Sequence, residues 1–454
     1  MAVSKVMERF IADRALCVMT RCILGHLMNS ELDGLFAESR ERQYEREIKF
    51  SALATSVADV VLGFCENPNQ SYKRHKEKIG ASIVAYYGKL NRVEPAISEG
   101  AVDFSFCKAG ELLREMRCPL QKVLKGYKCS ILDGNHLQKT EKRLGVLRCL
   151  VAAALPGTVV AKFNLEQQLF ERAYLLEDAH AQESTVLDRV VGDLQPDELL
   201  IADRHFCIVN FLLAVAKKLG CFVIRQHGRL KGELLGKRRQ IGRTSTGMVF
   251  EQKIKIGNGD DVLIVRRITV ELDCPTRDGD LEIHLLSNVP AKHASAGQLA
   301  ELYRDRWEIE NAFYVLTMTL TCEVKSIGQP RAALFLFSMA MLAYNCRQVL
   351  TGALRNVHGT EQVDAMSQHS MALAIVDPMG GMLTAIPEDE WDQQVPCTAS
   401  GRAKFLCRVA RHVDVPSHRK SVRGPKKPPP ERKRCKLGTH VSTYQLLKTQ
   451  KQRS

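Results

Sequence analysis

The feature that most constrains the fold of this chain is an alternation of strand-like and helical segments between Gly126 and Arg225. The buried-strand pattern DELLIADRHF at 197–206 is followed by a helical segment at 211–219 and a second strand-like run at 221–225. Strands that alternate with helices are typical of an α/β sheet. We therefore expect such a sheet in the middle of the chain.

The alternation of strands and helices is interrupted at residues 226–280, where the composition changes. The stretch is rich in Gly, Arg, Lys and Thr, and it contains strand-like runs such as MVFEQKIKI and VLIVRRITVEL. It predicts a β-rich insertion, after which LEIHLLS at 281–287 returns as a strand.

The segment Ala300 to Leu320 has no Gly or Pro, and its apolar residues recur at helical spacing. A second face carries Tyr303, Arg306 and Glu310, whose offsets of three and four residues stack them on one side of a helix. These spacings alone leave two interpretations open, a solvated charged face or part of a functional site.

Residues 1–118 are predicted to be almost wholly helical. A basic helix should end near Gly80, and Ser82 is a plausible N-cap for the next helix. Basic and aromatic side chains of that helix are expected to be exposed: Tyr86, Tyr87, Lys89 and Arg92. The pair fits a DNA-reading helix-turn-helix or an ordinary helical hairpin with a solvated face.

The net charge of +14 belongs to the C-terminal segment. Residues 401–454 hold sixteen Lys and Arg against two acids, so the first 400 residues are formally neutral. The Pro-interrupted run RGPKKPPPERKRCK should be extended and disordered, and basic tails of this kind usually bind nucleic acid or another polyanion. The residues expected to contact DNA there are Lys426, Lys427, Arg432, Lys433 and Arg434.

Other features argue against secretion or membrane insertion. The fifteen cysteines include no Cys-x-x-Cys pair, which favours reduced thiols in a cytosolic protein. The amphipathic N-terminus lacks the apolar core and cleavage site of a signal peptide. The longest apolar run, Ala332 to Tyr344, is too short to span a bilayer and predicts a core helix.

Two aspartates, Asp133 and Asp203, stand where strand-like runs give way to polar residues. Ligands of open α/β sheets bind at the carboxyl ends of strands, and Glu310 lies on a helix that can pack across such a sheet. Three carboxylates can hold two Mg²⁺ ions about 4 Å apart, which suits in-line phosphoryl transfer. The alternative is that each aspartate is only a turn residue or helix cap.

The sequence motifs around these acids are more specific than the spacing between the acids. ILDGNHL around Asp133, LIADRHF around Asp203 and LYRDRWEIENAF around Glu310 resemble the bacterial DDE transposases of the insertion-sequence-4 family. That family is marked by Tyr-x2-Arg-x3-Glu-x6-Lys, and Tyr303, Arg306 and Glu310 match in identity and register. The preceding LLSNVP and the following Tyr344-Asn345 also resemble the family. The resemblance extends over roughly residues 40–350, and its blocks occur in the expected order.

The resemblance implies an α/β, ribonuclease-H-like catalytic core with a β-rich insertion before the catalytic helix. Asp133, Asp203 and Glu310 would be the catalytic residues and metal ligands for two Mg²⁺ ions, which Mn²⁺ can replace. They would nick DNA at the ends of an insertion sequence, through a hairpin intermediate as in studied relatives, and rejoin it to a target. Tyr303 and Arg306 would contact phosphates near the scissile bond.

The same resemblance implies a synaptic homodimer in the bacterial cytoplasm, associated with the nucleoid, with no membrane. The expected organisation is a helical DNA-binding domain at 1–118, a catalytic domain at 119–350 that contains the insertion at 226–280, and a C-terminal region at 351–454 with the basic tail. The segment from about 351 to 400 is expected to be less regular than the helix before it.

Two departures from the family pattern keep other functions open. The family's lysine falls at Thr317, which cannot hold a phosphate by charge, and the only tryptophans, Trp307 and Trp391, lie outside the insertion. The second hypothesis is therefore a decayed or domesticated relative that binds DNA without chemistry. A third is a ribonuclease-H-like nuclease that cuts without joining strands.

Overall fold

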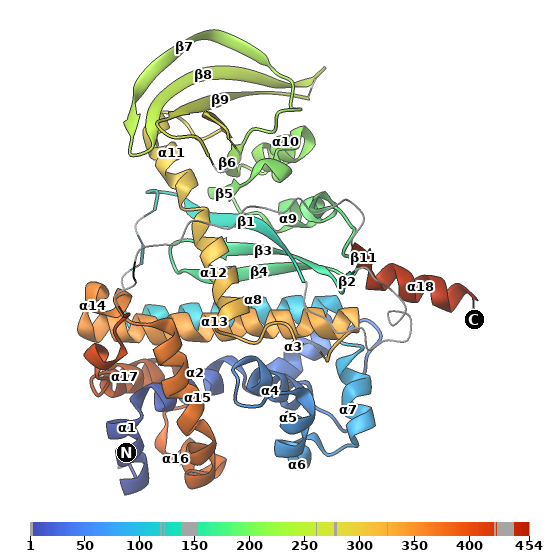
Figure 1. Cartoon of the computed structure of the whole chain (residues 1–454), viewed down its shortest axis with the longest axis vertical. Coiled ribbons are helices and arrows are strands. Elements are labelled where there is room, and N and C mark those ends of the chain that lie inside the picture. The colour runs from blue at the N-terminus through green and yellow to red at the C-terminus, as the bar shows by residue number, and fades with distance from the viewer. Residues whose placement is uncertain are drawn as a thin grey trace.

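The protein is described here by a computed structural model. It describes residues 3–453 except 119, 122, 138–152, 260, 277–278, 325, 422–423 and 425–439. Figure 1 shows three levels in this part of the chain: a helical body, a sheet lying across it, and a curved group of strands at the far end. The fold is mixed α/β, as the alternation of segments predicts.

A nine-stranded mixed sheet forms the centre, in the order β4-β3-β1-β5-β6-β10-β9-β8-β7. Strands β1, β5 and β6 are parallel neighbours, and their apolar runs fit burial on both faces. The strands of this sheet are β1 (Lys128–His136), β3 (Thr158–Asn164), β4 (Leu169–Leu176), β5 (Glu198–Ala202), β6 (Cys221–Arg225), β7 (Glu233–Thr244), β8 (Gly247–Asn258), β9 (Asp261–Leu272) and β10 (Glu282–Ser287).

The strands predicted within residues 226–280 are present, and they continue the sheet. Strands β7, β8 and β9 form antiparallel pairs, and β10 pairs antiparallel with both β9 and β6. The insertion therefore leaves the core after β6 and returns beside it, which brings the chain back to the sheet just before the helices that carry Tyr303 and Glu310.

Helices cover both faces of the core strands. One face packs against η2 (Glu183–Val186), α9 (Leu187–Asp193), η3 (Arg204–Phe206) and α10 (Val209–Lys217), through a core that includes Leu132, Leu200 and Phe222. The other face packs against α8 (Pro95–Glu115), α12 (Trp307–Met318) and α13 (Pro330–His358). Figure 1 shows α8 and α13 side by side beneath the sheet.

The helical character of residues 1–118 is confirmed, and these helices share one core with the C-terminal helices. The remaining N-terminal helices are α1 (Lys5–Asp13), α2 (Ala15–Leu27), α3 (Glu31–Ser39), α4 (Phe50–Val61), α5 (Pro68–Arg74), α6 (Lys76–Ile79) and α7 (Ile83–Leu90). Helix α13 is long and apolar enough to cross a membrane, but 89% of its most apolar window is buried in the molecule. It is the core helix that the apolar run predicts.

The helical pair around Gly80 is confirmed in outline and corrected in detail. Gly80 ends α6 with a φ of 65°, and the Ser82 side chain caps α7 by accepting from the Ala85 N–H. The expected exposure of Tyr86 and Lys89 is wrong, because α7 packs that face inward: Tyr86 is 0% exposed and bonds Ser56, and the Lys89 ammonium donates to the Ile48 carbonyl.

The expectation of an irregular segment from 351 to 400 is also wrong. The chain there completes α13 and forms α14 (Thr360–Asp364), α15 (Gln368–Ala385), α16 (Glu388–Gln394) and the start of α17 (Ala399–Ala410). Pro378 lies inside α15, and two glycines follow it, so residues that usually end a helix obscure its pattern.

Beyond η4 (Val415–His418), the described chain resumes at β11 (His440–Ser442), which pairs in parallel with β2 (Ala153–Leu155). The last described element is α18 (Thr443–Arg453). The five tail residues expected to contact DNA, from Lys426 to Arg434, lie outside the described residues.

Candidate active site

The two strand-end aspartates come from neighbouring strands. In the parallel pair of β1 and β5, Leu132 lies opposite Ala202, so Asp133 and Asp203 follow at the same level of the sheet. Asp203 caps η3 by accepting from the His205 N–H at 2.8 Å, and its other oxygen lies 3.2 Å from His205 Nδ1. The cap role that the sequence left open is thus real, and it coexists with a place beside Asp133.

Arg306 joins the helix to the sheet. Its guanidinium donates to Asp133 Oδ2 at 3.2 Å and to Glu310 Oε1 at 2.7 Å, and the arginine side chain is only 14% exposed. Helix α12 is held in this position by the buried residues Ile309, Phe313 and Leu316. The structure therefore brings Asp133, Glu310 and Arg306 together from distant parts of the sequence.

The pKa of Asp133 reflects its burial and its charged neighbours. Its pKa is raised to about 7 overall: burial is the largest cause and the charges of Asp203 and Glu310 add to the rise, while Arg306 and the Gly134 N–H oppose it. A carboxyl that feels two other acids in this way lies in a concentration of negative charge. Perturbed acids of this kind are a probabilistic marker of functional sites.

The prediction of a single helix over 300–320 is wrong, because the helix is interrupted between Arg304 and Trp307. The chain forms α11 (Ala296–Arg304) and α12, and bonds such as Arg306 N–H to the Tyr303 carbonyl, at 3.2 Å, tighten the turn between them. Burial raises the pKa of the Tyr303 phenol; the charge of Asp203 adds to the rise, and Arg306 opposes it.

At the position of the family's lysine, Thr317 bonds within its own helix. Its hydroxyl lies 3.2 Å from the Phe313 carbonyl and 3.0 Å from that of Tyr314. The residue therefore supplies no charge to the site.

The acids fit a divalent metal by chemistry, though not in their present arrangement. Carboxylate oxygens are the ligands that Mg²⁺ prefers. Within the part of the chain that the structure describes, no three Asp, Glu, His or Cys side chains already stand in a metal-binding group. Here the cation between Asp133 and Glu310 is Arg306, so metal binding requires that its guanidinium move away.

Glu183, the first residue of η2, is a further carboxylate near the end of β1 that sequence analysis does not single out. Burial raises the pKa of its carboxyl, and the charge of Asp203 raises it further while His205 lowers it. The only cue in the sequence is Gly134, which follows Asp133 directly and leaves space for this side chain.

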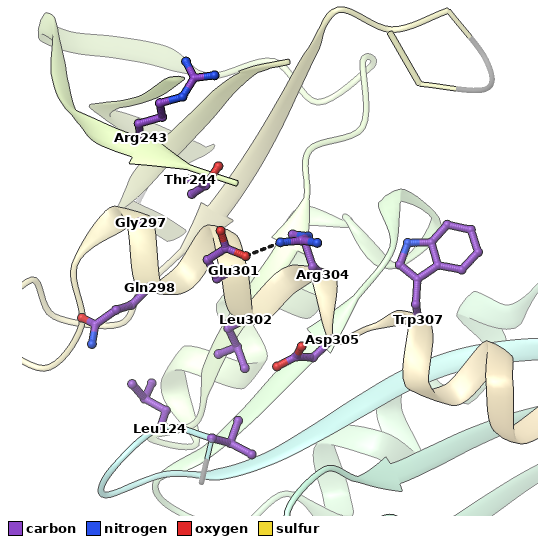
Figure 2. Close-up of a pocket in the computed structure, with 11 residues that line it drawn as sticks. Leu124, Arg243, Thr244, Gly297, Gln298, Glu301, Leu302, Arg304, Asp305 and Trp307 are labelled. Carbon is purple, nitrogen blue, oxygen red and sulfur yellow. Dashed lines mark hydrogen bonds and ion pairs between the residues drawn. The ribbon is translucent and has the colours of Figure 1, made fainter. Parts of the chain in front are cut away.

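A separate cavity lies beside α11 (Figure 2). It measures about 770 Å³ and is lined by residues of β7, α11 and the start of α12, including Trp307 at 61% exposed. Its arginines are paired: Arg304 with Glu301 at 2.6 Å, and Arg243 with Asp273 at 2.5 Å. Asp133, Asp203 and Glu310 are not among its lining residues, so this cavity is distinct from the candidate site at the strand ends.

Of the helical residues predicted to bind DNA, Arg92 is exposed and its contact stays a prediction. Lys89 is 9% exposed, and its ammonium lies over the Phe36 ring, 4.7 Å from the centroid. Buried in this way, it does not face DNA in this structure.

Comparison with known proteins supports a transposase domain. Residues 159–346 match the family model described as "Transposase DDE domain". The match covers less than half of the chain; it includes Asp203 and Glu310 and begins after Asp133. It supports the broader transposase assignment and does not single out the insertion-sequence-4 family.

Comparison with the curated proteins finds no match. Among solved structures, the chain is similar to the piggyBac transposase in a cryo-EM synaptic complex with hairpin DNA, with a TM-score of 0.40 and 10% identity. That alignment covers 89% of this chain and 86% of the other.

Proposed function

We propose that this protein is a DDE transposase of the insertion-sequence-4 type, which cuts DNA at the ends of an element and joins it to a target. The transposase-domain match supports the general activity. The observation that carries the proposal is the single guanidinium of Arg306, bonded to both Asp133 and Glu310 beside the strand end that holds Asp203.

In this proposal the core is ribonuclease-H-like, and Asp133, Asp203 and Glu310 hold two divalent ions. When bound, Mg²⁺ would stabilise the charge on the attacking and leaving oxygens of phosphoryl transfer. In this proposal, the ends of β1 and β5 and helix α12 would hold the three carboxylates around the ions, which would limit the reorganisation needed during the reaction.

Arg306 and Tyr303 have a second role in the proposal. A guanidinium binds phosphate in a bidentate manner, so Arg306 would exchange its carboxylate partners for a DNA phosphate near the scissile bond. Tyr303 lies next to it and can donate a hydrogen bond to the same phosphate. The basic C-terminal segment would add salt-dependent binding to the DNA backbone, and two copies of the chain would hold the two element ends.

A non-catalytic DNA-binding relative is the alternative, and Thr317 is the observation that favours it. A strand-transfer assay on linear DNA that carries candidate ends distinguishes the functions. Joined product supports the transposase, cutting without joining supports a nuclease, and binding without either supports the non-catalytic relative.

A further inference from the structure

A second cavity, of about 520 Å³, lies between α12, α13 and the turn that joins β3 to β4. Helix α12 contributes Glu308, Asn311 and Val315 to its wall, and Glu310 is not among the lining residues. Side-chain amides both donate and accept hydrogen bonds, and this cavity has six of them, so its lining suits a polar ligand. They belong to Gln121, Gln167, Gln168, Asn311, Gln348 and Gln368.

An arginine without an anionic partner lines this cavity. Arg347 belongs to α13, and its Nη1 atom is buried with no hydrogen-bond partner among the described residues. Burial lowers the pKa of its guanidinium, and Tyr344 opposes this. No carboxylate of the described residues forms an ion pair with Arg347. A guanidinium stays charged in proteins, so a buried one without a counterion is unfavourable until an anion joins it.

The other charged residues of the lining have partners. Arg355, two turns further along α13, donates to Asp364 Oδ1 from Nε at 3.2 Å and from Nη2 at 2.7 Å. Glu166 accepts from a backbone N–H of β1 at 3.1 Å, and Glu308 is hydrogen-bonded to the neighbouring asparagine of α12. Neither glutamate pairs with Arg347. The two glutamates can accept further bonds from a ligand's hydroxyl or amino groups.

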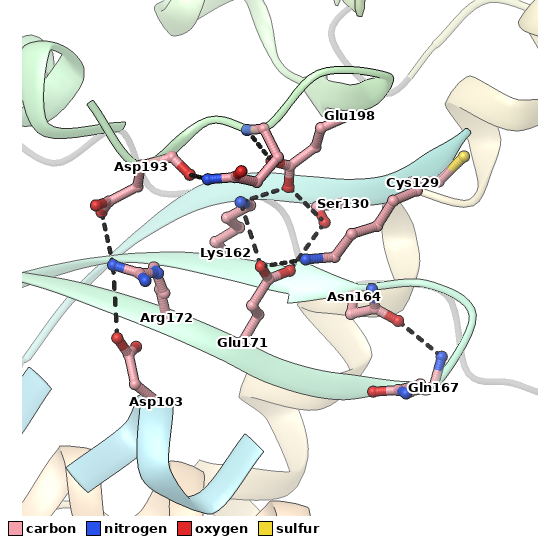
Figure 3. Close-up of polar contacts among 12 residues, drawn as sticks. Asp103, Cys129, Ser130, Lys162, Asn164, Gln167, Glu171, Arg172, Asp193 and Glu198 are labelled. Atoms are coloured by element: carbon pink, nitrogen blue, oxygen red, sulfur yellow. Dashed lines mark hydrogen bonds and ion pairs between the residues drawn. The ribbon is translucent and has the colours of Figure 1, made fainter. Parts of the chain in front are cut away.

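A second buried polar atom without a partner lines the same cavity. It is the side-chain oxygen of Gln167, Oε1, in the turn between β3 and β4. The Gln167 N–H donates to Asn164 Oδ1 at 2.8 Å, which holds the turn (Figure 3). Buried polar atoms are normally hydrogen-bonded. A ligand that satisfies both atoms therefore carries an oxyanion for Arg347 and a hydrogen-bond donor for Gln167.

A phosphate uses these donors more fully than a carboxylate does. It has three terminal oxygens, of which a guanidinium can bind two while side-chain amides donate to the third. We infer that this cavity binds a small phosphorylated molecule, whose phosphate pairs with Arg347 and whose hydroxyl or amino group donates to Gln167. A nucleoside monophosphate has both groups, whether it is free or stands at the end of a DNA strand.

The test is calorimetric titration of the full-length protein with deoxyadenosine monophosphate, and with deoxyadenosine as the probe that lacks the phosphate. The monophosphate should bind and the nucleoside should not. Arg347→Gln should weaken binding by about tenfold or more, because charge-assisted hydrogen bonds are lost. Absence of binding to the wild-type protein would overturn the inference.

The matched control is the double variant Arg355→Gln/Asp364→Asn. It removes a paired guanidinium from the same cavity without changing the net charge, and it should bind the monophosphate within about twofold of the wild type. An equal loss in Arg347→Gln and in the control would show that no particular guanidinium holds the phosphate, and it would overturn the inference.

Two further variants of Arg347 separate binding from a structural role. Arg347→Met removes an uncompensated buried charge, so the ligand-free protein should melt at a higher temperature, and the monophosphate should no longer raise that temperature. A lower melting temperature together with wild-type binding would overturn the inference. Arg347→Lys keeps the charge without the fork of donors, so it should fold normally and bind more weakly. Wild-type affinity in Arg347→Lys would contradict the pairing.

A short oligonucleotide with a 5′-phosphate, compared with the same strand without it, distinguishes the two sources of the ligand. Tighter binding of the phosphorylated strand that depends on Arg347 supports a strand end, and binding of the monophosphate alone supports a free nucleotide. Strand transfer without binding that depends on Arg347 rejects this inference alone. Binding that depends on Arg347 without strand transfer rejects only the transposase proposal.

Discussion

Two groups of buried charge lie on the same strands and differ in their balance. Figure 3 shows the first, in which Lys162 on β3 lies between Glu171 on β4 and Glu198 on β5. Lys128 adds a bond to Glu171 at 2.6 Å, so two lysines meet two glutamates. The second is the candidate active site, where Arg306 pairs with Asp133 and Glu310, and a third acid, Asp203, follows the neighbouring strand.

The pKa shifts follow from that balance. Burial alone would raise the pKa of Glu171, but Lys162 and Lys128 outweigh it and lower the pKa. At Asp133, burial and the other acids outweigh Arg306 and raise the pKa to about 7. A neutral network joins strands, whereas an excess of acid at the strand ends leaves negative charge for a further cation. This difference in charge balance distinguishes a structural group of charged side chains from the candidate functional group.

The largest effect, on DNA cleavage, should come from removing one of the three acids of the candidate active site. Glu310→Gln should reduce DNA cleavage by at least about a thousandfold, because it removes a metal ligand while keeping side-chain volume. Its melting temperature should stay close to that of the wild type. Glu308→Gln, on the same helix, is the control. Cleavage by Glu310→Gln near the wild-type rate would remove Glu310 from the site.

In the first group, where the charges of two lysines and two glutamates balance, a substitution should affect the stability of the fold. Lys162→Met leaves Glu171 and Glu198 buried with less positive charge, and it should lower the free energy of unfolding by about 3 to 5 kcal/mol. Lys128→Met is the control, since the Lys128 side chain is 40% exposed and its ion pair should contribute about 1 kcal/mol or less. Urea unfolding near neutral pH measures both. Equal losses would show that burial does not distinguish them.

The pH dependence of stability should have opposite signs in the two groups. Between about pH 4 and the native pKa of about 7, folded Asp133 keeps a proton that the unfolded chain has released, so its contribution to stability falls as pH rises. Glu171 acts oppositely: its contribution is present above the unfolded pKa of 4.5 and is lost as pH falls through the lowered native pKa.

The free energy of unfolding of Asp133→Asn, relative to that of the wild type, should therefore increase by about 2 kcal/mol when the pH is raised from about 5 to about 8. Chemical unfolding at the two pH values, without divalent ions, measures this difference. Parallel pH profiles of the two proteins would show that Asp133 keeps an ordinary pKa.

The smallest effect, on Mn²⁺ affinity, should come from substitution of Arg306. Arg306→Gln should strengthen Mn²⁺ binding to the DNA-free protein by up to about tenfold, because it removes the cation that competes for Asp133 and Glu310. The same variant should bind DNA more weakly. Calorimetry with Mn²⁺ and fluorescence anisotropy with labelled DNA report the two effects. A loss of Mn²⁺ affinity would mean that Arg306 positions the acids and does not compete for them.

The sequence predicts the parts of the site that have strong local patterns. Asp133 and Asp203 follow apolar strand runs, and Glu310 lies one turn from Arg306 on a helix with a clear apolar stripe. The contact between Glu183 and the Gly134 position has no such pattern, because Glu183 lies in the polar stretch HAQES and its position depends on packing of the helix after it.

Burial of charge was the hardest feature to predict. Lys162 ends an apolar strand run and gives no sign of its two partners, which lie on other strands. Lys89 and Tyr86 read as exposed because their residue types favour the surface, yet tertiary packing of α7 buries them. In both cases long-range contacts decide, and these are absent from local periodicity.

The break between α11 and α12 has a consequence for the exchange proposed for Arg306. Arg306 stands just before α12, with a 3.4 Å bond from the Ile309 N–H, whereas Glu310 is one turn inside the helix. Backbone rotation at this joint can carry the guanidinium off its acid partners without unwinding the helix that holds Glu310. The molecule can thus release its own internal counterion while the carboxylates it neutralised stay in register.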